Sequence, residues 1–355
     1  MRLFILSAVI LLHSVAIGLC PAAEPRLGTT FSQQQCDYLG IDWKETYEEI
    51  TGMDFEFLRL GAYWSRIERE EGEYDFSELD WQLDIAAQKK IKVLLTVGMK
   101  SPRWPEYYLP DWLKVKIRMR RGADITQHEE VRAAVLKFIR KVVGRYREHE
   151  AVYAWQIENE PFNHSGPFGW RIGRDFLQEE IALVRRLDPE NRPVVVNVLA
   201  TSNTFLRLLF RLIYRRDPIR ETVGIADIPA FNIYPVIGHK WGGMRFCFKT
   251  RMEQLVFYIR SLVQKVHGQQ KEAWVTELQA EPWEPGKLVH ADEEELMCPL
   301  QSYTSVFKEM ASVGFDTVFL WGVEYWYYRK VRHDDPSWMD TMKEIIPAHP
   351  SQLSP

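Results

Sequence analysis

The sequence has little of several features that would define other classes of protein. Its 355 residues carry 45 basic and 49 acidic side chains, a net charge of −4, so it lacks the basic excess of a strongly electrostatic nucleic-acid binder. It also has no low-complexity tract, no long block of like charge and, after residue 24, no Gly/Ser-rich linker. These absences exclude a collagen-like, mucin-like or largely disordered chain.

Cysteine is scarce, with four residues in the whole chain. Cys20 lies in the N-terminal segment, so removal of that segment would leave Cys36, Cys247 and Cys298. Three cysteines in an exported protein allow one disulfide at most and leave one thiol free. Their spacing matches no metal-binding motif, so we expect no cysteine chemistry and no metal site.

Only the N-terminus has an apolar run close to the length of a membrane span. Arg2 precedes the nearly uncharged segment Leu3–Leu19, and the small residues Cys20, Ala22 and Ala23 follow. This pattern is typical of a secretory signal over residues 1–23, with cleavage after Ala22 or Ala23, and predicts a periplasmic or extracellular protein. The alternatives are an uncleaved anchor, because about 17 apolar residues are near the lower limit for a span, lipidation of Cys20, or a buried N-terminal helix. Either of the first two would tether the chain to a membrane.

Residues 24–355 alternate between short apolar runs rich in β-branched residues and amphipathic helix patterns. Candidate strands begin near Leu27, Phe57, Lys92, Val152, Pro193, Ala230, Ala273 and Thr317. Among the helix patterns, one covers 77–90, one follows a capping box formed by Thr126 and Glu129, and others cover 175–187 and 251–267. The segment 114–121 alternates basic and apolar residues. It predicts either a cationic strand that meets an acidic glycan or a solvated hairpin face.

Strand–helix alternation implies a parallel sheet with crossover helices. Eight units in this length predict a closed (β/α)₈ barrel of one domain. The competing fold, an open doubly wound sheet, usually has a Gly-rich turn after its first strand. Here that turn reads SQQQCDYLG.

Aromatic residues are the excess in this sequence, with 13 Trp, 15 Tyr and 18 Phe. They suit either a large core or a site that binds ring-shaped ligands. In a barrel the working residues lie at the C-terminal ends of the strands and in the loops that follow. Several tryptophans occupy such positions: Trp64, Trp104, Trp112, Trp283, Trp321 and Trp326.

Two glutamates share this predicted face with the tryptophans. Glu160 follows the fourth strand and Glu277 ends the seventh, on opposite sides of an eight-stranded barrel. Glycosidic bond cleavage needs a protonated carboxyl to donate to the leaving oxygen and an ionised carboxylate to attack or stabilise the oxocarbenium-like centre. When two carboxyl groups lie close together, the charge of one raises the pKa of the other, so one can stay protonated near neutrality.

Four segments lie, in this order, at the predicted second, fourth, seventh and eighth strands: FLRLGAYWSRIEREEGEYDFSELD, AWQIENEP, WVTELQAEPW and LWGVEYW. With them, residues 27 to about 330 resemble the clan of retaining (β/α)₈-barrel glycoside hydrolases with catalytic glutamates on strands 4 and 7. That clan includes the cellulase-like family 5 and the β-galactosidase-type families 35 and 42. Family 5 usually has a His at the end of strand 3, whereas this chain reads VGMK at 97–100. The four-cysteine metal site of some β-galactosidases is also missing.

The resemblance implies a role for each matching residue. Glu160 would be the general acid/base and Glu277 the nucleophile of a double displacement, with their carboxyl groups roughly 5–5.5 Å apart. Asn159 would bind the sugar 2-hydroxyl, while Arg59 and Tyr234 would keep Glu277 ionised and oriented.

Aromatic and reserve positions complete the expected site. Trp321 would form the floor of the subsite for the cleaved sugar, and Trp104 and Trp283 are further candidate contacts. Glu158 is expected to be structural, with Glu281 and Glu324 as reserve carboxylates. The sequence thus predicts an exported retaining β-glycosidase that acts on oligo- or polysaccharides without a cofactor. The alternatives are a catalytically silent carbohydrate-binding barrel and a transglycosylase.

Overall fold

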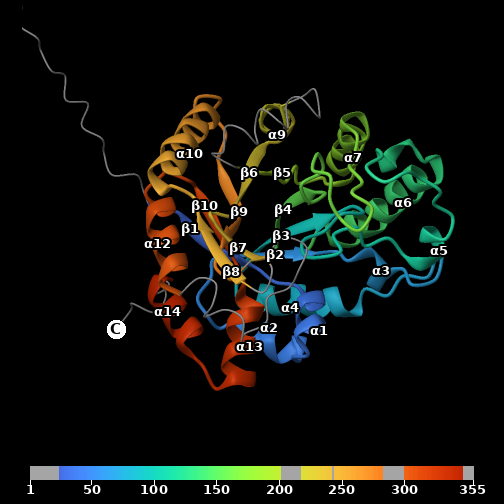
Figure 1. Ribbon diagram of the computed structural model, residues 1–355. Helices are drawn as coiled ribbons and strands as arrows, with labels where there is room; N and C mark the ends of the chain where they lie inside the picture. The colour runs from blue at the N-terminus through green and yellow to red at the C-terminus, as the bar shows by residue number, and fades with distance from the viewer. Residues whose placement is uncertain (1–23, 201–216, 242–243, 283–299, 347–355) are drawn as a thin grey trace, which may run out of the picture.

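A closed barrel of parallel strands forms the centre of the molecule (Figure 1). The computed structural model describes residues 24–200, 217–241, 244–282 and 300–346. The strand order around the barrel is β1-β10-β9-β6-β5-β4-β3-β2. The barrel strands are β1 (Arg26–Thr30), β2 (Phe57–Gly61), β3 (Lys92–Val97), β4 (Val152–Ile157), β5 (Val194–Leu199), β6 (Ile228–Ile233), β9 (Trp274–Gln279) and β10 (Thr317–Trp321). The predicted fold class and all eight predicted strands are confirmed.

Helices surround the barrel (Figure 1). In chain order they are α1 (Gln33–Leu39), α2 (Trp43–Ile50), α3 (Trp64–Ile67), α4 (Ser77–Gln88), α5 (Asp111–Lys114), the 3₁₀ helix η1 (Ile125–Gln127), α6 (Glu129–Tyr146), α7 (Arg174–Leu187), α9 (Pro218–Ile225), α10 (Met252–His267), α12 (Leu300–Ala311), α13 (Val323–His333) and α14 (Ser337–Ile345). Their apolar stripes pack on the outer surface of the strands and form the larger of two buried clusters.

Three local features of the structure differ from what the sequence predicts. An antiparallel hairpin of β7 (Val236–Trp241) and β8 (Met244–Lys249) follows β6 and was not predicted. The capping box is wrong, because Thr126 lies in η1 with its hydroxyl on Asp124, and α6 begins after His128. The segment 114–121 forms neither a strand nor a hairpin, and its first residue, Lys114, ends α5.

The barrel interior consists of two layers with different chemistry. The lower layer is apolar and includes Phe57, Leu94, Ala154, Val195, Ala230, Trp274 and Phe319. Side chains along a strand alternate between its two faces, so the next inward residue lies two positions further on. Toward the C-terminal ends of the strands these residues are polar and buried: Arg59, Gln156, Asn197, Asn232 and Thr276. The apolar layer therefore supports a platform of hydrogen-bonding groups.

The cysteine and N-terminal predictions are tested only in part. Cys36 is buried and free, and burial raises the pKa of its thiol. The side chain of Cys247, Cys298 and the predicted signal at 1–23 lie outside the described residues. Among the helices that the structure describes, none is both long and apolar enough to cross a membrane.

Candidate active site

Arg59 is the centre of the polar layer. It lies on β2, is completely buried, and donates to four oxygens, of which the Thr276 carbonyl at 3.4 Å is the most distant. Its Nε donates to Gln156 Oε1 at 2.7 Å and its Nη2 to Asn159 Oδ1 at 2.7 Å. Its Nη1 donates to Glu277 Oε1 at 2.7 Å. One cation thus links strands β2, β4 and β9 and fixes two predicted site residues.

An irregularity in β9 aims Glu277 at the barrel axis. Phe231 of β6 pairs with Val275, but the next residue, Asn232, pairs with Glu277, so Thr276 is an extra residue in β9. Such a bulge redirects the side chains beside it. Thr276 Oγ1 donates to Asn232 Oδ1 at 2.6 Å. Thr276 and Glu277 therefore both contribute to the polar layer, although they are adjacent in sequence.

Two donors hold the Glu277 carboxylate, which is 4% exposed. Arg59 contacts one oxygen, and the Tyr234 hydroxyl donates to the other at 2.6 Å. A cation and a hydroxyl donor both favour the charged form of a carboxylate. The geometry brings together Arg59, Tyr234 and Glu277, as the resemblance implied.

Glu160 lies immediately after β4, where the backbone takes an unusual path. Glu158 and Glu160 have φ values of 60° and 43°, in the left-handed region. Such conformations cost about 1–3 kcal/mol each and persist only where the surroundings fix them. Here the Glu160 amide donates to Asn197 Oδ1 at 2.7 Å, and the Asn159 amide donates to the Lys100 carbonyl at 2.8 Å.

The Glu160 carboxyl accepts one amide hydrogen bond at each oxygen. Asn232 Nδ2 is 2.7 Å from Oε1 and Asn163 Nδ2 is 2.7 Å from Oε2. Burial, and then repulsion by the Glu277 charge, raise the pKa of Glu160 to about 7 despite the nearby Lys100 ammonium. A carboxyl with this pKa carries a proton through much of the neutral range, and Glu277 lies close enough to influence it.

Beneath this turn, Glu158 is fully buried and joins β4 to the end of β3. Its carboxyl accepts from the amides of Met99 at 2.9 Å and Lys100 at 2.6 Å. Gly98 provides the space, since a Cβ there would lie 2.3 Å from the Glu158 carboxyl. Lys100 Nζ then donates to the Glu160 carbonyl at 2.8 Å. These contacts agree with a structural role for Glu158.

Glu158 faces a second buried carboxyl, that of Glu180 on α7. Burial raises the pKa of both groups, and repulsion by the Glu158 charge raises the pKa of Glu180 further. The folded protein therefore holds protons here that the unfolded chain releases near its ordinary pKa of 4.5. The stabilising effect is complete below that value and is lost as the pH rises through the raised folded-state pKa.

Replacing Glu180 with glutamine is expected to stabilise the protein at alkaline pH. The amide stays neutral and can donate to Glu158, so the cost of ionising the pair disappears. We expect the melting temperature at pH 8 to rise by about 3 °C, for a gain on the order of 1 kcal/mol. The difference should shrink at pH 5, where wild type holds its protons. Thermal unfolding at both values tests this, and a variant that is less stable at pH 8 contradicts it.

Trp321 borders the nucleophile side of the site and is 6% exposed. Its ring lies 6.4 Å from that of Tyr234, edge to face. Arg103, from the loop after β3, places its guanidinium carbon 3.9 Å from the Trp321 ring centroid. The same guanidinium forms ion pairs with Glu281 and Glu324. One face of Trp321 is therefore covered by an arginine, and both reserve carboxylates are engaged by it.

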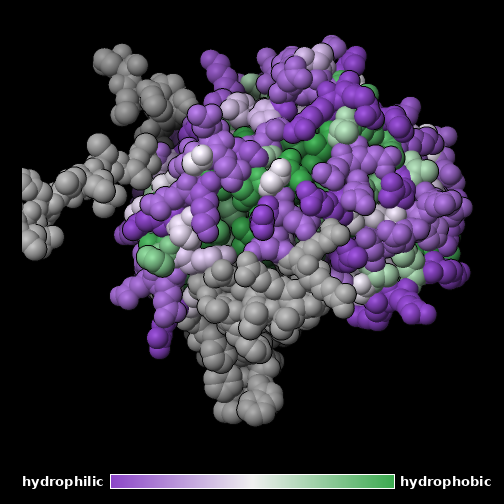
Figure 2. Space-filling view, turned by 90° about the horizontal axis from the view of Figure 1, so that it is seen from above, coloured by the Kyte–Doolittle hydropathy of each residue, from purple (hydrophilic) through white to green (hydrophobic). Residues whose placement is uncertain are grey.

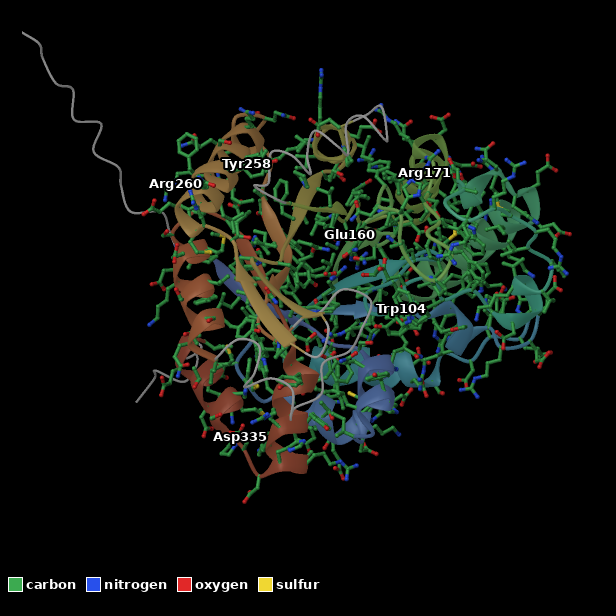
Figure 3. All side chains as sticks on the ribbon, in the orientation of Figure 1. Trp104, Glu160, Arg171, Tyr258, Arg260 and Asp335 are labelled. Atoms are coloured by element: carbon green, nitrogen blue, oxygen red, sulfur yellow. The ribbon has the colours of Figure 1, made fainter. Side chains whose placement is uncertain are left out.

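The two remaining aromatic candidates lie differently. Trp104 is 55% exposed on the loop after β3, and Figure 3 shows it on one side of Glu160. Trp283 lies outside the described residues. Within the residues that the structure describes, no group of three or more His, Cys, Asp or Glu side chains is arranged to hold a metal ion.

The surface around the barrel is mixed in character. Figure 2 shows hydrophobic residues grouped toward the middle of one face, with hydrophilic residues around them. This agrees with apolar strands at the centre of the molecule and with helices whose outer faces are polar.

Sequence reasoning did not assign roles to several residues that complete this network. Asn197 and Asn232 each lie two positions after an inward apolar residue, so the strand alternation could have revealed them. Asn163 contacts Glu160 from three residues away. Arg103 carries no such signal, because its partners Glu281 and Glu324 lie 178 and 221 residues further along the chain.

Comparison with a family model and with curated proteins gives matches to beta-galactosidases. The glycoside hydrolase 42 family model, described as beta-galactosidase, matches residues 37–204. The beta-galactosidase LacZ of Heyndrickxia coagulans is 29% identical over 126 residues, which are 33% of this chain and 19% of that protein. The chain therefore aligns with about a fifth of the length of such curated relatives.

Solved structures share the fold over most of the chain. A GH5_18 protein from Streptomyces cattleya, solved in complex with GlcNAc, superposes with a TM-score of 0.55 and 14% identity, covering 84% of this chain and 70% of its own. The beta-galactosidase of the haloarchaeon Halorubrum lacusprofundi gives 0.53 and 15%, covering 83% and 52%. At these identities the likeness concerns the fold.

Proposed function

We propose that this chain, a (β/α)₈ barrel that matches the beta-galactosidase family model over residues 37–204, is a retaining β-glycosidase. The observation that carries the proposal is the unequal treatment of two neighbouring carboxyls. Glu277 is held by Arg59 and Tyr234 at 2.7 and 2.6 Å, whereas the pKa of Glu160 is raised to about 7. This is the division between an ionised nucleophile and a protonated acid that glycoside cleavage requires.

The reaction follows from these positions. Glu277 attacks the anomeric carbon while Glu160 donates its proton to the leaving oxygen. The glycosyl–enzyme no longer carries the Glu277 charge, so one cause of the raised Glu160 pKa disappears. Glu160 then takes a proton from water, which attacks the anomeric carbon and frees Glu277. Asn159, whose Oδ1 accepts from Arg59 at 2.7 Å, binds the sugar 2-hydroxyl in this proposal.

A panel of 2-fluoro sugars tests the proposal. Galactosides come first, because the relatives are named as beta-galactosidases, followed by glucosides, mannosides and xylosides. We expect one sugar to inactivate the enzyme and to add its mass to the peptide that contains Glu277. NMR of the product should show retention at the anomeric carbon. Inversion, or failure of every sugar both to label and to be hydrolysed, would overturn the proposal.

The pH dependence of hydrolysis should report Glu160. As the pH rises through about 7, Glu160 loses the proton that it must donate, so kcat/KM should fall about tenfold per pH unit above that value. The effect is largest for substrates with poor leaving groups, which depend most on the acid. Initial rates on such an aryl glycoside from pH 5 to 9 measure it. A rate that is constant from pH 6 to 9 contradicts the assignment.

We also propose that the chain is exported. The basic Arg2, the apolar segment Leu3–Leu19 and the small residues before position 24 support this. N-terminal sequencing of the mature protein should begin at Ala23 or Glu24. A chain that begins at Met1, or one with a lipid on Cys20, would instead support a membrane tether.

A further inference from the structure

Glu180 is a buried carboxyl that the proposed reaction does not use. It lies midway along α7 and is completely buried. This helix follows β4 in the chain and packs against β4 and α6 (Figure 1). The hydrogen-bond partner of Glu180 is the Glu158 carboxyl, and neither of its oxygens has another partner among the described residues. Burial disfavours a charged carboxylate, so the place of this group on an apolar helix face indicates a role.

The surroundings of the two carboxyls determine which one carries the proton. Glu158 accepts from the amides of Met99 at 2.9 Å and Lys100 at 2.6 Å, and the buried Lys100 ammonium also favours its charged form. Glu180 has no such donors, and burial followed by the Glu158 charge raises its pKa well above the ordinary value. Glu180 is therefore the protonated member, and its hydroxyl donates to the Glu158 carboxylate in a charge-assisted hydrogen bond.

The Glu158 carboxylate joins two backbone turns that determine where Glu160 lies. Its two oxygens hold the amides of residues 99 and 100, just after β3. Lys100 then contacts the turn after β4 twice. Its carbonyl accepts from the Asn159 amide at 2.8 Å, and its Nζ donates to the Glu160 carbonyl at 2.8 Å. A displacement of the Glu158 carboxylate would therefore move both contacts.

The turn after β4 needs this support because its backbone is strained. Glu158 and Glu160 have φ values of 60° and 43°, and such conformations persist only where the surroundings fix them. A general acid must also lie within about 2.6–3.2 Å of the oxygen that it protonates. A misplacement of about 1 Å can lower a rate on the order of 10²-fold. Glu180 thus begins a chain of contacts that ends at the proposed proton donor.

The other charged groups near Glu180 leave its proton in place. Arg132 of α6 faces α7, but it pairs with Glu179 at 2.6 Å, and both of these side chains are exposed. The Arg132 charge lowers the pKa of Glu180, whereas the Glu179 charge raises it. Their effects oppose each other, so the Glu158 carboxylate remains the group that determines the protonation of Glu180.

We propose that Glu180 is a positioning residue for the acid step: its hydroxyl, acting through Glu158 and the residues after β3, holds the turn on which Glu160 lies. This inference rests on the proposed function, since it takes Glu160 as the acid. It implies that the reaction needs a hydrogen-bond donor at position 180 and no negative charge there.

The first test compares two replacements at position 180. Glu180→Gln keeps a donor on a side chain of the same length, whereas Glu180→Met fills the space without one. At pH 6, Glu180→Met should lower kcat/KM about tenfold for an aryl glycoside with a poor leaving group, the effect of one buried hydrogen bond, and by less than about twofold for a dinitrophenyl glycoside of the same sugar. Glu180→Gln should match wild type on both substrates.

The matched control is Glu179→Met, which makes the same replacement at the neighbouring residue on the exposed side of the helix. It should keep the wild-type rates on both substrates. A purely structural role for Glu180 predicts an equal loss on the two substrates, because it does not depend on the leaving group. An equal loss in Glu180→Met, no loss at all, or a loss of the same size in Glu180→Gln overturns the proposal.

Hydrogen exchange separates this inference from the proposed function, because it needs no turnover. In the full-length protein, peptides that cover residues 97–101 and 158–163 report on the two turns. Both peptides should exchange about tenfold faster in Glu180→Met than in wild type, while Glu180→Gln and Glu179→Met match wild type. Unchanged exchange in Glu180→Met overturns the positioning proposal. If exchange responds as expected but no glycoside is hydrolysed, the chain of contacts stands and only the proposed function is overturned.

Discussion

Replacing Glu277 with glutamine is expected to lower kcat for aryl β-glycosides by a factor on the order of 10⁴ or more. An amide cannot attack the anomeric carbon, and Arg59 and Tyr234 would face a neutral group where they now hold a carboxylate. The shape of the side chain hardly changes, so the protein should fold. Initial rates on the aryl glycoside that wild type prefers give the measurement.

Two controls make the Glu277 result decisive. Glu253→Gln changes an exposed carboxylate on α10 and should keep wild-type activity. The 2-fluoro sugar that labels wild type should leave Glu277→Gln unlabelled. If this variant kept more than about a tenth of the activity, or took the label elsewhere, the nucleophile would have to be another residue.

Replacing Glu160 with alanine is expected to have an effect that depends on the leaving group. For glycosides with poor leaving groups, kcat/KM should fall by about 10²–10⁴, the usual contribution of a general acid. Dinitrophenyl glycosides need no protonation, so their cleavage should fall far less. Added azide should then restore turnover, because it can attack the glycosyl–enzyme without help from a base, and should yield a β-glycosyl azide.

The azide product distinguishes the Glu160 role from general damage to the site. A variant that has merely lost its packing would lose activity equally on all leaving groups and would not respond to azide. Glu160→Gln offers a second, nearly isosteric variant, in which the new NH2 group meets the Nδ2 donor of Asn163 or Asn232 unless that amide turns its oxygen toward it. An equal loss on all substrates in both variants would exclude Glu160 as the acid.

The sequence predicted the barrel because its strands are distinct local signals. Runs such as KVLLTV and VVVNVL are short, apolar and rich in β-branched residues, and each is followed by a helix pattern. The β7–β8 hairpin lacks that contrast, so no strand is predicted between the strand near Ala230 and the helix pattern at 251–267. The Thr126 capping box failed because Asp124 engages the same hydroxyl and leads into η1 instead.

The candidate site was predictable for those residues that lie at or just after the C-terminal ends of the barrel strands. Glu160 follows the end of β4 and Glu277 lies in the C-terminal half of β9, so the barrel topology predicts both on one face. The contacts around these two glutamates join residues that are far apart in the sequence, so no local pattern predicts them. Arg103 follows β3, whereas Glu281 follows β9 and Glu324 follows β10, so these ion pairs form only because the closed barrel brings these segments together at one end. The extra residue Thr276 in β9, which lets the adjacent Glu277 face inward as well, likewise has no signal in the sequence WVTELQ.

The two layers inside the barrel have separate roles: the apolar layer holds the barrel together, and the polar layer carries the groups of the candidate site. Residues such as Phe57, Trp274 and Phe319 fill the lower layer, and the hydrogen-bonding platform stands above it. We expect substitutions among the asparagine, threonine and glutamine residues of the platform to change reactivity, while the apolar layer keeps the barrel closed. Such a scaffold can acquire a new substrate by changes in the platform and the loops above it, with its stability held in reserve by residues that no substrate touches.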